Sequence, residues 1–359
     1  MTVPTTTAPA GTVKVPAGGR PDAPTARLIL PADAPEEEWH AVRRTGIGGS
    51  DVAAILGLDR WKSPLRVWRE KLGHRSDVDS EAAECGREME EVIARLFARR
   101  TSDVGLRVAP PPGTLAHREH RWMLVNVDRY VTDYRGVVLG LLECKNRSEH
   151  QWRDWENGVP DAPALQAHWG MAVGGWDRAW VAALIGGNRL RWYRLERDEE
   201  MIAHLIQLCG DWWQQHVVDG EPPPPDGSKA TTELLAHLWD VQPEAVVQIQ
   251  AARAKELRAR YLDLRDQIAE LQEQKAEVAN QMRFETGENE IAMVGASTAW
   301  TWKQNGPLQQ AKFRKAQPEL AAKYTRTVEV LDTTALLNDH PDVCRPYRGR
   351  HLYVPEKGI

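Results

Sequence analysis

The chain has 359 residues, of which 42% are hydrophobic, and a formal net charge of -5 at pH 7. This composition supports a real hydrophobic core, and the negative charge excludes a protein that coats nucleic acid by bulk positive charge. No apolar run approaches the roughly 20 residues of a membrane span, and the first residues lack the apolar core of a signal peptide, so we expect a cytoplasmic protein that contacts no membrane. The four cysteines are scattered without a C-x-x-C pair, which favours reduced thiols.

Composition divides the chain into five segments. Residues 1–35 are rich in Pro, Thr, Ala and Gly, which predicts a disordered arm, and residues 36–220 form a domain of conventional size. The consecutive prolines within 221–229 predict a stiff, extended linker. We expect a helical, coiled-coil segment at 230–288 and a small α+β region at 289–359.

The first candidate binding feature is the run TGIGGSDVAAILGL at residues 45–58. Ser50 is a good N-cap for a helix that stops at Gly57, and the preceding glycines let a ligand approach the backbone closely. Free N–H groups, a hydroxyl and the helix dipole together form an anion site. The alternative is that Ser50 is only a cap and that Arg43, seven residues earlier, is a surface residue.

The run CGREMEEVIARLFARR at residues 85–100 predicts an amphipathic helix, because its apolar side chains recur at helical spacing. Glu90 lies at the border of the apolar stripe. This carboxylate can therefore face the protein interior rather than solvent.

The run GVVLGLLECKN at residues 136–146 predicts a buried strand that ends in two charges. Because strand side chains alternate, Glu143 and Lys145 share one face with Leu141 and point into one pocket. Burying such charges costs several kcal/mol unless they are paired or hold a metal. The alternative is a surface ion pair at a strand end, since E-x-K tripeptides are common.

A second strand is predicted by RWMLVNVDRYV at residues 121–131, which contains Asp128. A short turn between the two strands would place Asp128 near Glu143, so that these carboxylates, Glu90 and Lys145 can converge. Oxygen ligands of this kind suit Mg²⁺, with Mn²⁺ as a substitute. A metal there would stabilise charge on a scissile phosphate, while Lys145 orients or helps to deprotonate the attacking water.

Apolar residues from Ala254 to Met282 follow alternating three- and four-residue spacing, interrupted at Lys275. This heptad seam predicts a long helix that pairs with another helix, or with itself in an oligomer. A helical hairpin packed on its own domain is the alternative.

The order of Glu90, Asp128, the triplet E-C-K and Gln166 in LQAHWGMAVGG resembles the PD-(D/E)xK nuclease superfamily, and specifically its lambda-exonuclease-like, YqaJ-type phage recombination nucleases. The resemblance covers about Trp39 to Asp219 and includes three further motifs. The sequence departs from the family pattern where Val127 and Arg129 replace a Pro and a Gly, and where Pro163 replaces a Tyr. The three further motifs are TGIGGSDVAAILGL followed by WKSPLRVWREKLG, GREME, and RLERDEEM.

The resemblance implies an α/β fold with a restriction-endonuclease-like core, in which helices flank a mixed central sheet, followed by a coiled-coil and α+β extension. It implies that Gln166 helps to hold the attacking water or Lys145, and that Arg43 and Ser50 bind a DNA 5′-phosphate. The implied metal ligands are Asp128, Glu143, Glu90 and the backbone carbonyl of Cys144.

The implied function is a Mg²⁺-dependent 5′→3′ exonuclease on double-stranded DNA ends, encoded by a phage or prophage in a bacterial host. It would expose a 3′ single strand for a phage single-strand annealing protein, and the family implies a homo-oligomer such as a ring-shaped trimer. Two alternatives stay open: a structure- or site-specific endonuclease of the same fold, and a non-catalytic DNA-end-binding or assembly module.

Overall fold

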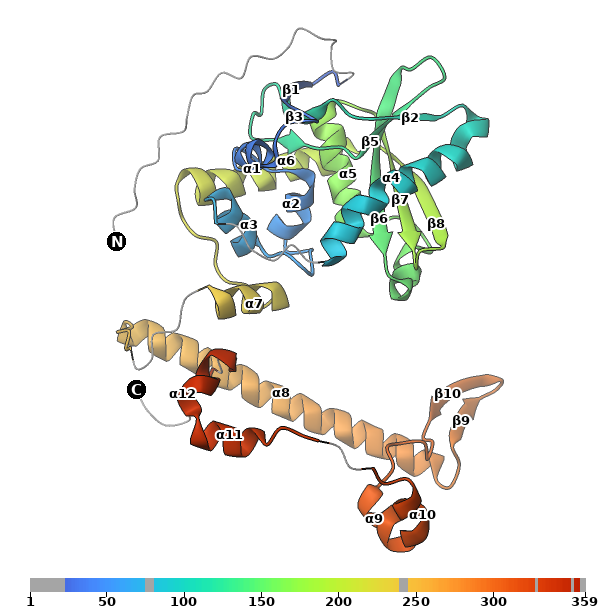
Figure 1. Ribbon diagram of the computed structural model, residues 1–359, viewed down its shortest axis with the longest axis vertical. Coiled ribbons are helices and arrows are strands. Elements are labelled where there is room, and N and C mark those ends of the chain that lie inside the picture. Colours follow the sequence, from blue (N-terminus) through green and yellow to red (C-terminus); the bar gives the residue numbers. More distant parts are fainter. Residues whose placement is uncertain (1–22, 75–80, 239–244, 327–328, 350–351, 356–359) are drawn as a thin grey trace. The chain divides into compact units, whose positions relative to one another are not determined.

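A computed structural model of the chain describes residues 23–74, 81–238, 245–326, 329–349 and 352–355 (Figure 1). The chain divides into two compact units, Met1–Trp239 and Asp240–Ile359. In the described residues, no helix has the length and apolar character that a membrane span requires.

The centre of the first unit is a five-stranded sheet in the order β2-β5-β6-β7-β8. Strands β6 and β7 run parallel and the other neighbours are antiparallel, so the mixed central sheet expected from the sequence is confirmed. Its strands are β2 (Arg107–Ala109), β5 (Arg129–Thr132), β6 (Val138–Arg147), β7 (Arg178–Ile185) and β8 (Arg189–Glu196).

Two helices cover opposite faces of this sheet (Figure 1). The alternation of β6 sends Leu142 and Cys144 to the core beneath α4 (Glu81–Thr101), and Leu141 to the core beneath α5 (Asp161–Gly174). Gly170 lets α5 approach β6, because a Cβ there would lie 2.4 Å from Leu141 Cδ2. The sheet is thus apolar on both faces, and the charges of β6 are confined to the end of the strand.

A smaller sheet with the order β1-β3-β4 adjoins this core. Its first strand, β1 (Ala26–Pro31), pairs antiparallel with β3 (Gly113–His117) and buries Ala26 and Leu30. The prediction of a disordered arm over residues 1–35 is therefore wrong for β1, since alternating apolar residues there find a partner strand; residues 1–22 lie outside the described part of the chain.

The predicted strand over residues 121–131 is also wrong as one element. It splits into β4 (Leu124–Val125), which pairs with β3, and β5, which pairs with β6. Asp128 lies in the break between them. The backbone changes sheets at this point, so the acid is presented by a bend and not by a strand face.

The remaining helices of the first unit lie on the smaller sheet and on the α5 side of the central sheet, except η1, which follows α4 and packs on it. Helix α7 follows the proline-rich stretch and packs against α3, so it belongs to this unit. These elements are α1 (Glu36–Arg43), α2 (Gly49–Ile55), α3 (Pro64–Lys71), η1 (Ser102–Val104), η2 (Glu149–Trp155), α6 (Glu199–Trp212), η3 (Trp213–Val218) and α7 (Lys229–His237).

The second unit is built on one uninterrupted helix, α8 (Ala251–Thr286), so the hairpin alternative for the heptad seam is wrong. Seam side chains such as Leu264 and Ile268 are about half exposed on α8, at 47% and 55%. The other elements are β9 (Ile291–Val294), β10 (Ser297–Thr301), α9 (Gln310–Ala316), α10 (Pro318–Lys323), α11 (Thr333–Asp339), α12 (Pro341–Cys344) and η4 (Arg345–Tyr347).

Candidate active site

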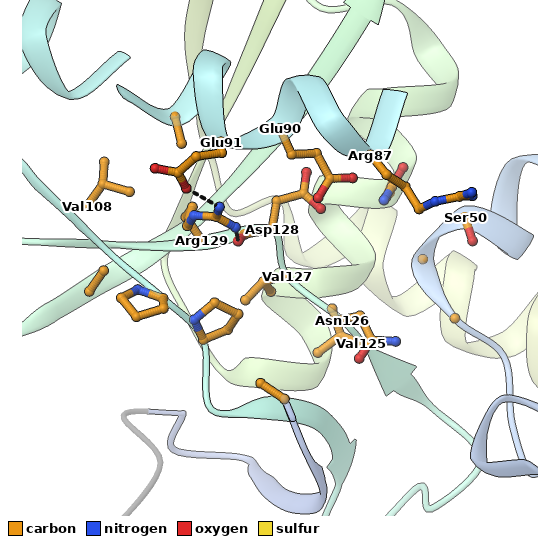
Figure 2. A pocket seen from close by; sticks show the side chains of 18 of the residues that line it. Ser50, Arg87, Glu90, Glu91, Val108, Val125, Asn126, Val127, Asp128 and Arg129 are labelled. Atoms are coloured by element: carbon orange, nitrogen blue, oxygen red, sulfur yellow. Dashed lines mark hydrogen bonds and ion pairs between the residues drawn. The ribbon is translucent and has the colours of Figure 1, made fainter. Parts of the chain in front are cut away.

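Three carboxylates and a lysine converge near the end of β6, and we call them the carboxylate cluster: Glu90, Asp128, Glu143 and Lys145. Glu90 comes from α4 and Asp128 from the bend before β5, and the two side chains point toward each other (Figure 2). Glu143 is 1% exposed, so its carboxyl group lies inside the protein. The sequence predicted all four members.

Hydrogen bonds hold this cluster in place. Lys145 Nζ donates to Glu143 Oε2 at 3.1 Å and to Gln166 Oε1 at 2.9 Å, which brings the glutamine of α5 into the site as predicted from the resemblance. The backbone N–H of Cys144 donates to Asp128 Oδ2 at 2.6 Å. The Cys144 side chain faces the opposite core, while its peptide group orients Asp128; sequence reasoning missed this N–H because the contact depends on the bend before β5.

The pKa values of the three carboxyl groups in the cluster are raised above their ordinary values. Burial, with the charge of Asp128, raises the pKa of Glu143 to about 8. Burial and the same neighbour raise the pKa of Glu90 to about 7, and burial raises the pKa of Asp128. Several carboxylates that share one partly buried space repel one another, so a cation is needed to ionise them together at neutral pH.

Lys145 supplies part of that positive charge. Burial alone would lower the pKa of its ammonium group, but the carboxylates of Glu143 and Asp128 outweigh burial and raise the pKa above its usual value. Lys145 is therefore a fixed cation at neutral pH. One ammonium group still faces three carboxyl groups.

The donor set fits a hard divalent cation. Among the described residues, Glu143 Oε1 is a buried oxygen with no hydrogen-bond partner, and an unsatisfied buried carboxylate oxygen is costly unless an ion binds it. The described side chains contain no ready-made cage of three or more His, Cys, Asp or Glu ligands. Carboxylate oxygens are nevertheless the donor type that Mg²⁺ prefers, and this ion keeps waters that substrate phosphate can replace.

Two members of the carboxylate cluster, Glu90 and Asp128, line a cleft of about 870 Å³, whereas Glu143 and Lys145 lie behind its lining. Gln166, Arg43 and Ser50 line the same cleft. Arg43 Nη2 donates to Ser50 Oγ at 3.2 Å, so the two residues expected to bind phosphate lie together. The structure thus brings the two groups of candidate residues to one opening.

The local role predicted for Ser50 is wrong. Helix α2 begins at Gly49 after the cap residue Gly48, and Asp51 Oδ2 accepts the Gly48 N–H at 3.1 Å, so the carboxylate takes the capping role expected of the hydroxyl. The helix has only seven residues and ends at Ile55, two residues before the expected stop. Positive charge at this wall therefore comes from side chains more than from a helix dipole.

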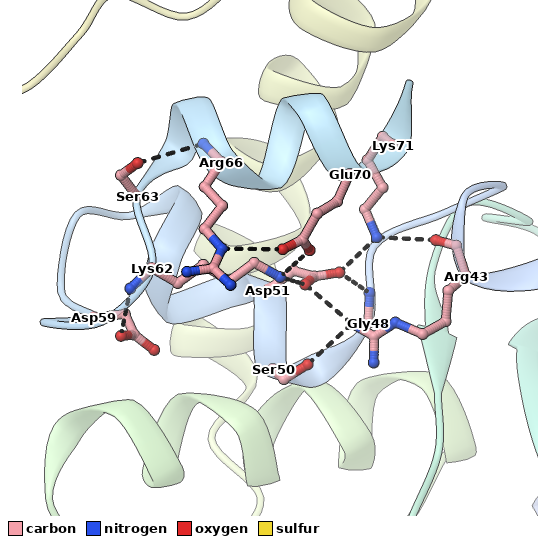
Figure 3. Close-up of polar contacts among 10 residues, drawn as sticks. All are labelled: Arg43, Gly48, Ser50, Asp51, Asp59, Lys62, Ser63, Arg66, Glu70 and Lys71. Carbon is pink, nitrogen blue, oxygen red and sulfur yellow. Dashed lines mark hydrogen bonds and ion pairs between the residues drawn. The ribbon is translucent and has the colours of Figure 1, made fainter. Parts of the chain in front are cut away.

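Sequence reasoning also missed the residues that support Arg43. Asp51, Lys62 and Lys71 form buried ion pairs beside it (Figure 3). They come from three separate elements of local structure and have no spacing that marks them as a group. A signal was present only in the acid itself, because Asp51 follows two glycines and a serine within a run that is otherwise apolar.

Comparison with known proteins places this site in a family. The model of the YqaJ-like viral recombinase domain matches residues 38–177, the segment that carries the carboxylate cluster and Gln166. The chain is 34% identical to protein YqaJ of Bacillus subtilis (strain 168) over 273 residues, which cover 74% of this chain and 83% of that protein.

Solved structures of two nucleases are also similar. An alkaline exonuclease (LHK-Exo) from Laribacter hongkongensis is 21% identical and aligns with a TM-score of 0.41, over 51% of this chain and 93% of that chain. A phage related exonuclease from Haemophilus somnus 129PT is 14% identical, with a TM-score of 0.36, over 49% of this chain and 96% of that chain. On the length and identity of the YqaJ match, and with the carboxylate cluster inside the matched segment, the chain belongs to the YqaJ-like viral recombinase family.

Proposed function

We propose that the protein is a Mg²⁺-dependent 5′→3′ exonuclease that degrades one strand of linear double-stranded DNA from its end. The observation that carries this proposal is the shared cleft, in which Arg43 and Ser50 face the same opening as Glu90, Asp128 and Gln166. A phosphate anchor beside the hydrolytic site selects a chain end, because a terminal phosphate carries more negative charge than an internal phosphodiester.

The proposed chemistry assigns a task to each residue. Asp128 and Glu143, with the Cys144 carbonyl and Glu90, hold a divalent cation, which when bound stabilises negative charge on the scissile phosphate. Gln166 Oε1 and Glu143 Oε2 fix Lys145 by accepting two of its hydrogen bonds. An ammonium group has three N–H donors, so one is left for the attacking water or a phosphate oxygen. The raised pKa of Lys145 favours the orienting role over the deprotonating one.

We also propose the biological setting implied by the family. The product is a 3′ single-stranded tail that a phage single-strand annealing protein uses for recombination in the cytoplasm of a bacterial host. The half-exposed seam of α8 supports an assembly role for the second unit, either in a homo-oligomer such as a trimer or with that annealing protein.

A digestion assay tests the proposal. Pure protein is incubated with linear and with covalently closed circular duplex, in Mg²⁺ or in EDTA, and released nucleotides are measured. We expect mononucleotide release from linear DNA in Mg²⁺ and none in EDTA. With strands labelled at the 5′ or at the 3′ terminus, the 5′ label should be released first. Cleavage of the circle would indicate an endonuclease, and DNA binding without cleavage would indicate an end-binding module.

A further inference from the structure

Beside the cleft lies a second group of charges around a buried acid, which we call the Asp51 cluster: Arg43, Asp51, Lys62, Arg66, Glu70 and Lys71 (Figure 3). The Asp51 side chain has no exposed surface, and Lys71 is 3% exposed. Lys71 Nζ lies 2.6 Å from Asp51 Oδ2, while Lys62 Nζ and Arg43 Nη2 lie 2.8 Å and 3.2 Å from Asp51 Oδ1. Three cations therefore share one buried carboxylate.

The cluster has more positive than negative groups. Its second acid, Glu70, pairs with Lys62 at 2.5 Å and with Arg66 at 3.3 Å. Among the described residues, the carboxylates of Asp51 and Glu70 thus face the three cations Arg43, Lys62 and Lys71. Although burial opposes it, the surrounding cations hold the pKa of Asp51 well below its usual value, and the acid stays charged. The Arg43 side chain is 25% exposed and lines the cleft, so it presents positive charge there to an anion.

Arg43 is held on several sides. Its Nη2 donates to Asp51 Oδ1 and to Ser50 Oγ, its guanidinium lies 4.9 Å from the ring centre of Trp39, and its backbone carbonyl accepts from Lys71 Nζ at 2.9 Å. Both side-chain hydrogen bonds of Arg43 to described residues leave from Nη2. The N–H groups on Nε and Nη1 can therefore bind a phosphate without breaking the contacts that orient the side chain.

Lys71 connects the two ends of this arrangement. One ammonium group donates both to Asp51 Oδ2 and to the Arg43 carbonyl, so it ties the carboxylate to the backbone that carries the guanidinium. Neither Asp51 nor Lys71 lines the cleft. Their contacts with the cleft wall run through Arg43.

From these contacts we infer that Asp51 and Lys71 are positioning residues that fix Arg43 for a terminal 5′-phosphate, and that they set the preference for phosphorylated over hydroxyl DNA ends. The inference rests on the proposed exonuclease function. A preoriented guanidinium binds the doubly charged, three-oxygen terminal phosphate better than a mobile one, because less side-chain entropy is lost per hydrogen bond. A mobile arginine still contributes charge but discriminates less between ends.

The test compares kcat/KM on duplexes that differ only in a 5′-phosphate or a 5′-hydroxyl. We expect the wild type to prefer the phosphate by tenfold or more, an effect of about 1.4 kcal/mol. Asp51→Asn keeps the shape of the side chain but loses its charge, and should reduce the ratio about tenfold, mainly through KM on phosphorylated ends. Glu70→Gln is the matched control, since it removes the same charge from the cluster without touching Arg43, and should keep the ratio.

A second variant covers failure of Asp51→Asn to fold. Lys71→Met preserves length and apolar contact but releases the Arg43 carbonyl, and it should also lower the ratio. A folded Asp51→Asn or Lys71→Met protein with the wild-type ratio overturns the inference and leaves the exonuclease proposal standing. The same holds if a variant loses kcat/KM equally on both kinds of end, or if Glu70→Gln changes the ratio as much as Asp51→Asn does. A wild type that releases nucleotides equally from both ends overturns the inference together with its phosphate anchor, and one that releases none overturns the proposed function as well.

Discussion

The carboxylate cluster and the Asp51 cluster are both groups of charge around a buried acid, but the sign of the excess charge is opposite in the two. In the first, three carboxyl groups face Lys145, and burial raises the pKa of Glu143 to about 8. In the second, cations outnumber carboxylates, and the pKa of Asp51 is held well below its usual value. A cation would balance the excess of carboxyl groups in the first cluster, and an anion would balance the excess of cations in the second.

The two clusters also differ in what the cleft exposes. The carboxylate cluster presents two of its acids, Glu90 and Asp128, to the cleft, whereas the Asp51 cluster presents Arg43 and keeps Asp51 buried. A metal needs direct oxygen ligands, while a phosphate needs an oriented donor. The charges around a buried acid therefore decide which ligand its site suits: an excess of carboxyl groups suits a cation, and an excess of cations suits an anion.

The largest effect should come from breaking the first cluster. Glu143→Gln keeps the volume of the side chain and removes the charge needed by a cation, so nucleotide release should fall by about 10³-fold. Asp128→Ala and Lys145→Ala should be similarly inactive, with DNA binding kept, as measured by release from linear duplex and by gel shift. Glu91→Gln is a suitable control on α4, since this exposed acid pairs with Arg129 instead. A Glu143→Gln protein with the wild-type rate would contradict the metal site.

A smaller effect is expected at Arg43, the member of the Asp51 cluster that lines the cleft. Arg43→Ala removes the guanidinium and should abolish the preference for 5′-phosphorylated ends, a loss of roughly 10- to 100-fold in kcat/KM on those ends. Arg43→Lys keeps the charge without the planar fork and should recover only part of the preference. Kinetics on paired phosphate and hydroxyl duplexes measures both variants, and an unchanged preference in Arg43→Ala would remove the anchor from the cleft.

The opposite pKa shifts predict opposite pH dependence of stability. Without metal, the raised pKa of about 8 keeps folded Glu143 protonated at neutral pH, while unfolded Glu ionises near its ordinary pKa of 4.5. The metal-free protein should therefore lose stability as pH rises between these values, by at most about 1.4 kcal/mol per pH unit for this proton. Asp51, with its lowered pKa, stabilises the fold above the unfolded value of 3.8 and loses this contribution only as pH falls through its folded value.

Thermal unfolding in EDTA, from below pH 3.8 to about pH 8, is the measurement. A change of about 1 kcal/mol should shift Tm by about 2–4 °C for a domain of this size. Mg²⁺ should restore more stability at the alkaline end than at the acid end, because it favours the ionised carboxylates. Glu143→Gln should flatten the slope between pH 4.5 and about 8, and Asp51→Asn should flatten the slope below pH 3.8, where Asp51 loses its contribution. A Tm in EDTA that is independent of pH between about 5 and 8 would contradict the raised pKa.

The smallest effect on chemistry should follow removal of the second unit. A chain that ends at Trp239 keeps both clusters and both apolar cores, so it should release nucleotides in Mg²⁺ at close to the full rate. Light scattering should show a changed assembly state, or binding to the annealing protein should be lost, because the α8 seam is absent. Folded but inactive protein would show that the second unit contributes to the site; unchanged mass together with unchanged partner binding would show that the seam is no interface.

The sequence was sufficient for features that depend on local pattern. Strand periodicity in β6 predicted that Glu143 and Lys145 share a face, and helical periodicity in α4 predicted that Glu90 can turn inward; both are found. Gln166 was identified only through the family resemblance, since one amide on a mostly buried helix has no distinctive spacing.

Features that depend on tertiary packing could not be predicted. Asp128 was assigned to a continuous strand, because nothing in MLVNVDRYV shows that β4 and β5 pair with different sheets. The bond from the Cys144 N–H to Asp128 follows from that break. Ser50 was given a capping role by residue preference, yet Asp51 next to it is held by lysines 11 and 20 residues away and caps the helix itself.

The length of α8 has a separate consequence. At 1.5 Å per residue its 36 residues extend about 54 Å, which corresponds to about 16 base pairs of duplex at 3.4 Å each. Stiffness is part of this property, since a continuous helix keeps its span where a flexible linker of equal length would collapse to a fraction of its contour. Helix α8 therefore keeps its first turn and the β9–β10 hairpin at a fixed separation, which its number of residues sets.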